Sequence, residues 1–293
     1  ADRLTDGAVA VAEKMKMPQI VIGLTIVAMG TSMPEFCVSF ISALKGTSDL
    51  AVGNIVGSNI FNALLIVGVS ALVAPMTIME TTVRKDIPFA LVASALLLIM
   101  CLDGNISRID AGILFAMFLI FMYMTLKGAK KQGADAEAAD EAEGKKPMAT
   151  WLSVVWILVG LLCLIGGSNL FVEGATAVAT SLGVSEAVIG LTIVAGGTSL
   201  PELATSVVSA RKGNSGIAIG NALGSNVFNI LAILGITGMI TPMTLKGITY
   251  IDLSMLVISI MLVWLFSFTK YKIERWEGAV LTAVFVGYIY SLL

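Results

Sequence analysis

Residues 22–35 read IGLTIVAMGTSMPE, and residues 189–202 read IGLTIVAGGTSLPE. Each copy places a glutamate, Glu35 or Glu202, directly after a proline within an otherwise apolar run. The match indicates an internal duplication whose two copies each carry one acid in an apolar setting.

The composition predicts a membrane protein. The chain has 293 residues, a mean hydropathy of +0.94 and only 13% charged residues, whereas soluble domains carry about 25%. Repeated apolar runs of about 20 residues predict an all-α polytopic membrane protein with the lipid bilayer as its partner. The net charge of −2 gives no indication of a nucleic-acid partner. The absence of histidine removes the usual general base and the commonest transition-metal ligand.

The apolar runs predict ten transmembrane helices, the first of them N-terminally incomplete. They are expected at 1–14, 18–44, 50–73, 87–102, 109–126, 149–180, 185–210, 216–240, 248–268 and 275–293. The stretch 128–148 is rich in Ala, Gly, Lys and acids, without apolar periodicity, and predicts a linker. The expected organisation is a first five-helix repeat at 1–127, the linker at 128–148 and a second repeat at 149–293.

The two halves align at a constant separation along the chain, the one that relates Glu35 to Glu202, which we call the repeat offset. At this offset the stretch 7–62 matches 174–229 without a gap. The duplication therefore extends well beyond the glutamate motif, as expected of a repeated structural unit.

The same alignment indicates that the first helix is incomplete. Ala1 falls opposite Ser168, whereas the first helix of the second repeat begins near Ala149. An unmatched half-helix leaves backbone groups unsatisfied in lipid. We therefore expect the native protein to have residues before Ala1 that complete the first helix.

The distribution of basic residues predicts the orientation. One set of loops holds Lys14, Lys16, Arg84, Lys85, Lys127, Lys130, Lys131, Lys145, Lys146, Arg211, Lys212, Lys270, Lys272 and Arg275, and the other holds Lys45, Arg108 and Lys246. Basic loops face the cytosol, so the linker at 128–147 is expected to be cytosolic and both termini outside. Five helices per repeat is an odd number, so the second repeat is expected to be inverted, as in secondary transporters.

The motif around each glutamate is suited to hard cations. Pro34 and Pro201 are expected to break the helix and to expose carbonyls from Ala28 and Ala195 onward. Hydroxyl oxygens are added by Thr31, Ser32, Thr198 and Ser199. Such an all-oxygen cage suits Na⁺ or Ca²⁺ rather than zinc or copper. A simple proline kink would explain the Gly, Thr, Ser and Pro residues, but it does not explain the glutamates. Placing one charged side chain at the centre of a membrane costs about 2.5–3.5 kcal/mol of insertion free energy.

A second repeated motif reads GNIVGSNIFN at 53–62 and GNALGSNVFN at 220–229. The i, i+4, i+8 spacing places three polar residues of each copy on one helix face; these are Asn54, Ser58 and Asn62, then Asn221, Ser225 and Asn229. Each asparagine is equally compatible with a purely structural hydrogen bond between helices. Asn59 and Asn226 lie on another face and are expected to be structural. The glycines form small-xxx-small patterns that allow close helix packing.

Charge arithmetic favours an exchanger. Two glutamates supply a charge of −2, which one Ca²⁺ or several Na⁺ ions neutralise. Both cations then need the same carboxylates, and mutual exclusion at one site is what antiport requires.

Two further aligned acids, Asp6 and Glu173, either line an ion path or lie near an interface. Five other acids near predicted loops are interpreted as solvated helix ends: Glu80, Asp86, Asp103, Asp110 and Asp252.

At the paired GTSxPE and GNxxGSNxFN motifs the sequence resembles the cation/Ca²⁺ exchanger superfamily, and within it the prokaryotic Na⁺/Ca²⁺ exchangers. The resemblance implies a multi-pass protein of a prokaryotic plasma (inner) membrane, with no cofactor, whose long first helices slide past the core. It also implies that Glu35 and Glu202 bind Ca²⁺ and Na⁺ alternately. The implied sites are completed by Thr31, Ser32, Thr198, Ser199, Ser58, Ser225, Asn62, Asn229 and the carbonyls of Ala28 and Ala195.

The resemblance leaves one close alternative. The asparagine at position 229 is the residue type that the resemblance associates with K⁺-independent exchangers, because K⁺-dependent relatives carry aspartate at this position. Proton-coupled relatives usually carry GNxxE in place of GTSxPE, which argues against H⁺/Ca²⁺ exchange, or H⁺ exchange for another divalent cation, without excluding it.

Two other classes of function fit the sequence less well. An intramembrane enzyme with Ser32 or Ser199 as nucleophile lacks a histidine, and no lysine is predicted in the core. A channel through the same polar residues does not require inverted repeats. The sequence makes no prediction of the oligomeric state.

Overall fold

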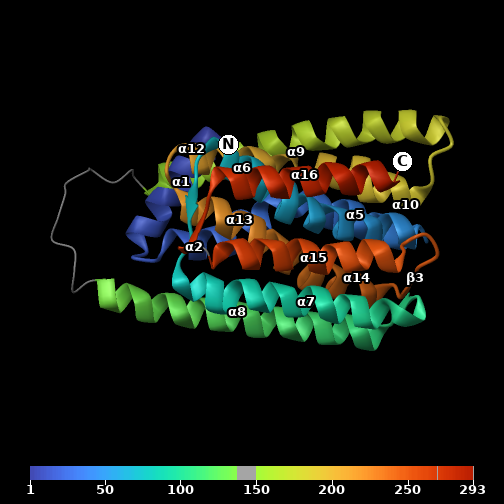
Figure 1. The fold of residues 1–293 in the computed structure, drawn as a ribbon, viewed down its shortest axis with the longest axis horizontal. Coiled ribbons are helices and arrows are strands. Elements are labelled where there is room, and N and C mark those ends of the chain that lie inside the picture. Colours follow the sequence, from blue (N-terminus) through green and yellow to red (C-terminus); the bar gives the residue numbers. More distant parts are fainter. Residues whose placement is uncertain (137–149, 269, 293) are drawn as a thin grey trace.

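The computed structural model describes residues 1–136, 150–268 and 270–292, and its helices run roughly along the long axis of the molecule (Figure 1). The first half contains α1 (Asp2–Lys14), α2 (Gln19–Ile22), η1 (Gly23–Val27), α3 (Ala28–Thr31), α4 (Met33–Leu44), α5 (Ser48–Ile60), η2 (Phe61–Ile66), α6 (Val67–Val73), β1 (Met76–Thr77), η3 (Thr82–Asp86), α7 (Ile87–Met100), η4 (Cys101–Asp103), β2 (Asn105–Ile106) and α8 (Arg108–Ala136). The second half contains α9 (Thr150–Ser181), α10 (Glu186–Ile189), η5 (Gly190–Val194), α11 (Ala195–Thr198), α12 (Leu200–Arg211), α13 (Ser215–Val227), η6 (Phe228–Ile233), α14 (Leu234–Ile240), β3 (Met243–Thr244), α15 (Tyr250–Ser267), β4 (Lys272–Ile273) and α16 (Arg275–Leu292).

Six continuous helical stretches in the described residues are long and apolar enough to cross a membrane. They are Ser48–Val73, Thr82–Asp103, Arg108–Ala129, Trp151–Ser181, Ser215–Ile240 and Tyr250–Ser267, and two bent helix pairs raise the number to as many as eight. The predicted helices at 1–14 and 275–293 correspond to α1 and α16, which lie outside this set. Helix α8 continues to Ala136, into the predicted linker, and the rest of that linker lies outside the described residues.

The two helices that carry the GTSxPE motifs, which we call the motif helices, are both broken, as the prolines predict. The axis bends by 46° between Gln19–Thr31 and Met33–Leu44, and by 52° between Gly190–Thr198 and Leu200–Arg211. The bends fall at Ser32 and Ser199, and a proline occupies the first turn of the helix that follows each. Proline is well tolerated there, because the first N–H groups of a helix have no partner within it.

Each break is preceded by a π-helical segment that the sequence does not predict. Segments η1 and η5 are related by the repeat offset, and so are η2 and η6. Single π-helical turns are found frequently at functional sites. Their repetition at matched positions indicates that the duplicated unit carries them as a fixed feature.

The two helices that carry the GNxxGSNxFN motifs, Ser48–Val73 and Ser215–Ile240, form the core of the molecule, and we call them the core helices. The membrane-spanning window in Ser48–Val73 is 78% buried and that in Ser215–Ile240 is 83% buried, whereas that in Trp151–Ser181 is 11% buried. Glycines bring these core helices against the motif helices: a Cβ added at Gly224 would lie 2.6 Å from the Leu24 Cα atom. The small-xxx-small prediction is thereby confirmed.

Two short antiparallel ladders connect the halves. Strand β1 pairs with β4, and β2 pairs with β3. The repeat offset relates β1 to β3 and β2 to β4, so each ladder contains one strand from each half. Figure 1 shows the two ladders at opposite ends of the molecule.

The prediction that Asp252 is a solvated helix end is wrong. Its side chain is 2% exposed and completes a capping box with Thr249 at the start of α15. The Tyr288 O–H donates a hydrogen bond of 2.9 Å to the second carboxylate oxygen. Packing of α16 against α15 therefore covers an acid that its position near a loop suggested was exposed.

Candidate cation site

The predicted site residues come together in one buried cluster. The bends place Ser32 and Ser199 beside the first turns of α4 and α12, which carry the two glutamates. Relative exposure is 0–1% at every predicted position: Ala28, Thr31, Ser32, Glu35, Ser58, Asn62, Ala195, Thr198, Ser199, Glu202, Ser225 and Asn229. Burial of a carboxylate is costly unless the charge is paired and hydrogen-bonded.

Each glutamate is held by the serine of the other repeat. The Ser32 O–H donates to Glu202 Oε1 at 2.8 Å, and the Ser199 O–H donates to Glu35 Oε1 at 3.0 Å. The sequence did not predict this exchange, because each serine is only three positions from its own glutamate. The helix break turns each serine away from that neighbour and toward the opposite repeat.

Four buried oxygens in the cluster have no hydrogen-bond partner in the described part of the chain. They are Glu35 Oε2, Glu202 Oε2, Asn62 Oδ1 and Asn229 Oδ1. Buried polar atoms are nearly always partnered, so each exception needs an explanation. Oxygens from both repeats that lack donors are suitable ligands for a cation.

Neutral oxygens lie around the carboxylates. The Ser225 O–H contacts Glu202 Oε1 at 3.4 Å, and the Ser58 O–H donates to the Ala195 carbonyl at 3.3 Å. The expectation that the break frees the carbonyls of Ala28 and Ala195 is only partly met. Each still accepts a backbone N–H, from Ser32 or Ser199, because the bend falls one turn later. Both carbonyls also accept hydroxyl donors, Ala28 from Thr31 at 3.3 Å and Ala195 from Ser58 and Thr198 at 3.3 Å each. A cation bound at either carbonyl would therefore replace one of these long hydroxyl contacts.

A surrounding layer of side chains fixes the threonines. The Thr198 O–H donates to Asn54 Oδ1 at 3.1 Å, and Asn54 Nδ2 donates to Ser39 Oγ at 2.9 Å. The second repeat has the same arrangement, with Asn221 between Thr31 and Ser206. The serines of this layer were missed in the sequence, although the repeat offset that relates them was a signal.

Asn59 and Asn226 join the two core helices where they cross. Each side-chain amide donates to the other residue's backbone carbonyl, at 3.2 and 3.3 Å. This contact agrees with the structural role expected from their position on the helix. Asn59 Oδ1 also accepts a hydrogen bond of 3.0 Å from Asn229 Nδ2, which orients the oxygen of Asn229 away from this contact.

The chemistry of the cluster is that of a hard-cation site. Within the described residues no group of three or more His, Cys, Asp and Glu side chains gathers in a metal-binding arrangement. Two carboxylates surrounded by hydroxyl, amide and carbonyl oxygens favour alkali and alkaline-earth cations over softer transition metals.

Comparison with known proteins agrees with this chemistry. The family model described as "Sodium/calcium exchanger protein" matches residues 1–127 and 152–293. The chain belongs to this family. Its members are transporters, so the alternative of an intramembrane enzyme with Ser32 or Ser199 as nucleophile is wrong.

Three relatives illustrate the similarity. Inner membrane protein YrbG of Escherichia coli is 36% identical over 298 residues, covering 100% of this chain and 92% of that protein. Sodium/calcium exchanger MaX1 of Methanosarcina acetivorans is 30% identical over 329 residues, covering 100% and 94%. A structure of the sodium-calcium exchanger NCX_Mj soaked with Na⁺ and Sr²⁺ has a TM-score of 0.83 and 30% identity, covering 100% and 93%. The predicted resemblance is confirmed across the whole chain.

Proposed function

We propose that this protein exchanges Na⁺ for Ca²⁺ across a prokaryotic inner membrane, by alternating access at one shared site. Glu35 and Glu202 are the charged ligands in this proposal. The neutral ligands are Thr31, Ser32, Ser58, Asn62, Thr198, Ser199, Ser225, Asn229 and the carbonyls of Ala28 and Ala195. Sodium/calcium exchangers among the relatives support the choice of ions.

One observation carries the proposal. The two carboxylates are fully buried, and each has an oxygen without a donor in the described residues while the other oxygen is held by a serine of the opposite repeat. A single Ca²⁺ neutralises both charges. Sodium ions that use the same carboxylates exclude Ca²⁺. Each time the site changes the side of the membrane to which it opens, it therefore carries one kind of cation or the other.

The proposed architecture is ten helices in two inverted five-helix repeats, at 1–127 and 149–293, joined by the linker at 128–148. The matched π-helical segments and the two exchanged strand ladders support a two-fold relation between the repeats. In this arrangement the linker is cytosolic and both termini lie outside. The site then lies near the midplane, between the repeats, as is usual for such transporters.

Independence from K⁺ is part of the proposal. It rests on Asn229, a neutral side chain whose amide contacts Asn59 and whose oxygen lacks a partner among the described residues. A neutral oxygen adds a ligand without adding charge, so Asn229 supplies no third carboxylate to hold a co-transported monovalent cation beside Ca²⁺.

The test is ⁴⁵Ca²⁺ uptake into proteoliposomes under imposed Na⁺, K⁺ and H⁺ gradients, each applied alone. We expect uptake driven by an outward-directed Na⁺ gradient, without stimulation by K⁺. Uptake that follows the pH gradient and ignores Na⁺ would instead identify an H⁺/Ca²⁺ antiporter. Continuous single-channel currents in a planar bilayer would contradict the carrier mechanism.

A further inference from the structure

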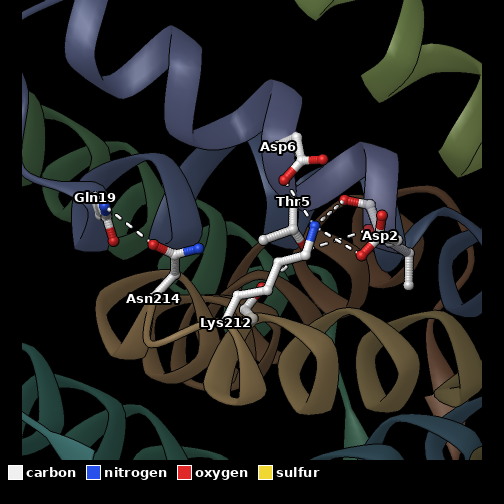
Figure 2. Close-up of polar contacts among 8 residues, drawn as sticks. Asp2, Thr5, Asp6, Gln19, Lys212 and Asn214 are labelled. Carbon is white, nitrogen blue, oxygen red and sulfur yellow. Dashed lines mark hydrogen bonds and ion pairs between the residues drawn. The ribbon is translucent and has the colours of Figure 1, made fainter. Parts of the chain in front are cut away.

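A cluster of charged and polar side chains joins α1 to the end of α12, outside the cation site. Lys212 Nζ lies 2.7 Å from Asp2 Oδ1 and 2.7 Å from Asp6 Oδ1, and it donates a hydrogen bond of 3.1 Å to the Asp2 carbonyl. Figure 2 shows the Lys212 side chain reaching from α12 across to these two acids on α1. One lysine therefore holds two successive turns of α1.

Neighbouring contacts extend the same junction. The hydroxyls of Thr5 and Ser209 are 3.1 Å apart and both fully buried. Gln19 Nε2 lies 3.4 Å from Asn214 Oδ1, which connects the start of α2 to the turn after α12 (Figure 2). Desolvation opposes the charge on Lys212, but its hydrogen bonds to Asp2 and Asp6 outweigh this effect and raise its pKa.

The repeat offset identifies the equivalent positions in the other repeat. Lys212 corresponds to Lys45, and Asp6 corresponds to Glu173. Lys45 follows α4 directly and Glu173 lies on α9, so the pair Lys212–Asp6 is repeated in residue type and in the elements that carry it, whereas Asp2 corresponds to Asn169. Both side chains are exposed, and the structure gives no ion pair between these two described residues.

The two junctions lie at opposite ends of the molecule. The turn after α12 lies near the end where α8 finishes and α9 begins, which we call the linker end (Figure 1). Lys45 lies one helical turn before Asp49 in the sequence, and the Asp49 carboxylate accepts backbone N–H groups of Lys246 and Gly247 beside β3, at the other end. The ion pairs of Lys212 with Asp2 and Asp6 are therefore formed at the linker end, while the equivalent described residues Lys45 and Glu173, at the other end, are not paired with each other.

Helix packing shows the same asymmetry. A Cβ added at Gly197 would lie 2.5 Å from Val172 and 2.9 Å from Phe171, both on α9. The equivalent glycine, Gly30, has the side chain of Leu161 nearest to it, at 2.6 Å, instead of residues of α1. Helices α1 and α9 therefore hold different positions against their two motif helices, as expected of a single state of a two-state molecule.

We propose that Asp2, Asp6 and Lys212 form a latch that closes the linker end in this conformation, and that Glu173 and Lys45 form the equivalent latch at the other end in the opposite conformation. The proposal rests on alternating access as the proposed function. Two latches that form in turn stabilise each closed end without fixing either permanently. Exposed ion pairs are weak enough for this, because each shifts a two-state equilibrium by no more than about fivefold.

The first test measures opening at the linker end without measuring transport. Ser209→Cys serves as a reporter in a chain whose native cysteines, Cys37, Cys101 and Cys163, are replaced by alanine. Labelling by a maleimide is followed in nanodiscs, where both faces are accessible. We expect Lys212→Gln to accelerate labelling about two- to fivefold, and Lys45→Gln to leave it unchanged or slow it.

Arg211→Gln is the matched control, since Arg211 is an exposed cation next to Lys212 that forms no ion pair within the described residues. Equal labelling rates in Lys212→Gln and Arg211→Gln would overturn the proposal. A fall in thermal stability of Lys212→Gln without faster labelling would do the same, because it indicates a structural contact only.

The second test captures the latch of the opposite conformation. The Lys45→Cys/Glu173→Cys pair, in the same cysteine-free background, is oxidised with copper phenanthroline and followed by gel mobility. We expect a disulfide that forms faster when Lys212→Gln is added. A pair that never cross-links contradicts the proposal. Neither readout depends on which ions are carried, so failure of Na⁺/Ca²⁺ exchange and failure of the latch are distinguished.

Discussion

Gly57 packs closely against the second motif helix, beside the proposed cation site, so we expect a substitution there to alter ion binding. A Cβ added at Gly57 would meet the Leu191 carbonyl oxygen, the Leu191 Cα atom at 2.8 Å and the Ala195 Cβ atom at 2.7 Å. Carbon atoms in contact are normally about 3.5–4.0 Å apart, so Gly57→Ala requires the helices to separate by about 1 Å. Two of the three atoms belong to the backbone, which has no rotamer by which to avoid the methyl group.

We expect this displacement to affect both folding stability and ion binding. Overpacking of this kind costs about 1–3 kcal/mol of folding free energy. Calcium ligands lie within a narrow range of about 2.3–2.6 Å, so a shift of about 1 Å would move the Ala195 carbonyl, one of the proposed ligands, out of coordinating distance. A loss of about 1.4 kcal/mol in binding free energy corresponds to a tenfold weaker affinity. We expect Gly57→Ala to bind Ca²⁺ at least about tenfold more weakly.

The assay compares Gly57→Ala with Gly287→Ala, whose added Cβ would have no atom within 4 Å. Thermal unfolding in detergent reports stability, and the Ca²⁺ dependence of ⁴⁵Ca²⁺ uptake reports affinity. The control should match the wild type in both measurements. A folded Gly57→Ala variant with unchanged Ca²⁺ affinity would refute the link between this close contact and the site.

Further predictions concern the hydrogen bonds of buried acids. Ser32→Ala removes the donor to Glu202 Oε1, and a hydrogen bond to a charged group contributes about 1.5–3 kcal/mol. We expect Ca²⁺ affinity in uptake assays to fall roughly tenfold or more, with a similar fall in Ser199→Ala; an effect in only one of the two would argue against equivalent roles. Tyr288→Phe leaves one oxygen of Asp252 without its donor and should lower the unfolding temperature in detergent while Ca²⁺ affinity stays at the wild-type value. Altered ion affinity in Tyr288→Phe would show that Asp252 belongs to the transport path.

Features that depend on local sequence were predictable. The GTSxPE motifs identified the positions of both helix breaks, because the effect of proline on a helix is local. The repeat offset identified the residues that gather in the core, and the glycine spacing identified the close helix contacts. The resemblance to exchangers followed from the same motifs and is confirmed by the family match.

Features that depend on tertiary distances were not predictable. The exchange of serines between repeats follows from the direction in which Ser32 and Ser199 point after the bend, which spacing along the chain does not specify. The burial of Asp252 depends on how α16 packs against α15. For Asp6 the sequence left two interpretations open, and only the fold reveals its contact with Lys212.

The shared site is tested by ⁴⁵Ca²⁺ binding to the purified protein during titration with Na⁺, in the wild type, Glu35→Gln and Glu202→Gln. These substitutions keep the size of the side chain and remove one of the two glutamate charges from the site. We expect one Ca²⁺ per wild-type chain, displaced by Na⁺ and not by K⁺, and loss of high-affinity binding in both variants. Undiminished Ca²⁺ binding in either variant, or wild-type binding that Na⁺ fails to displace, would contradict a site shared by the two carboxylates.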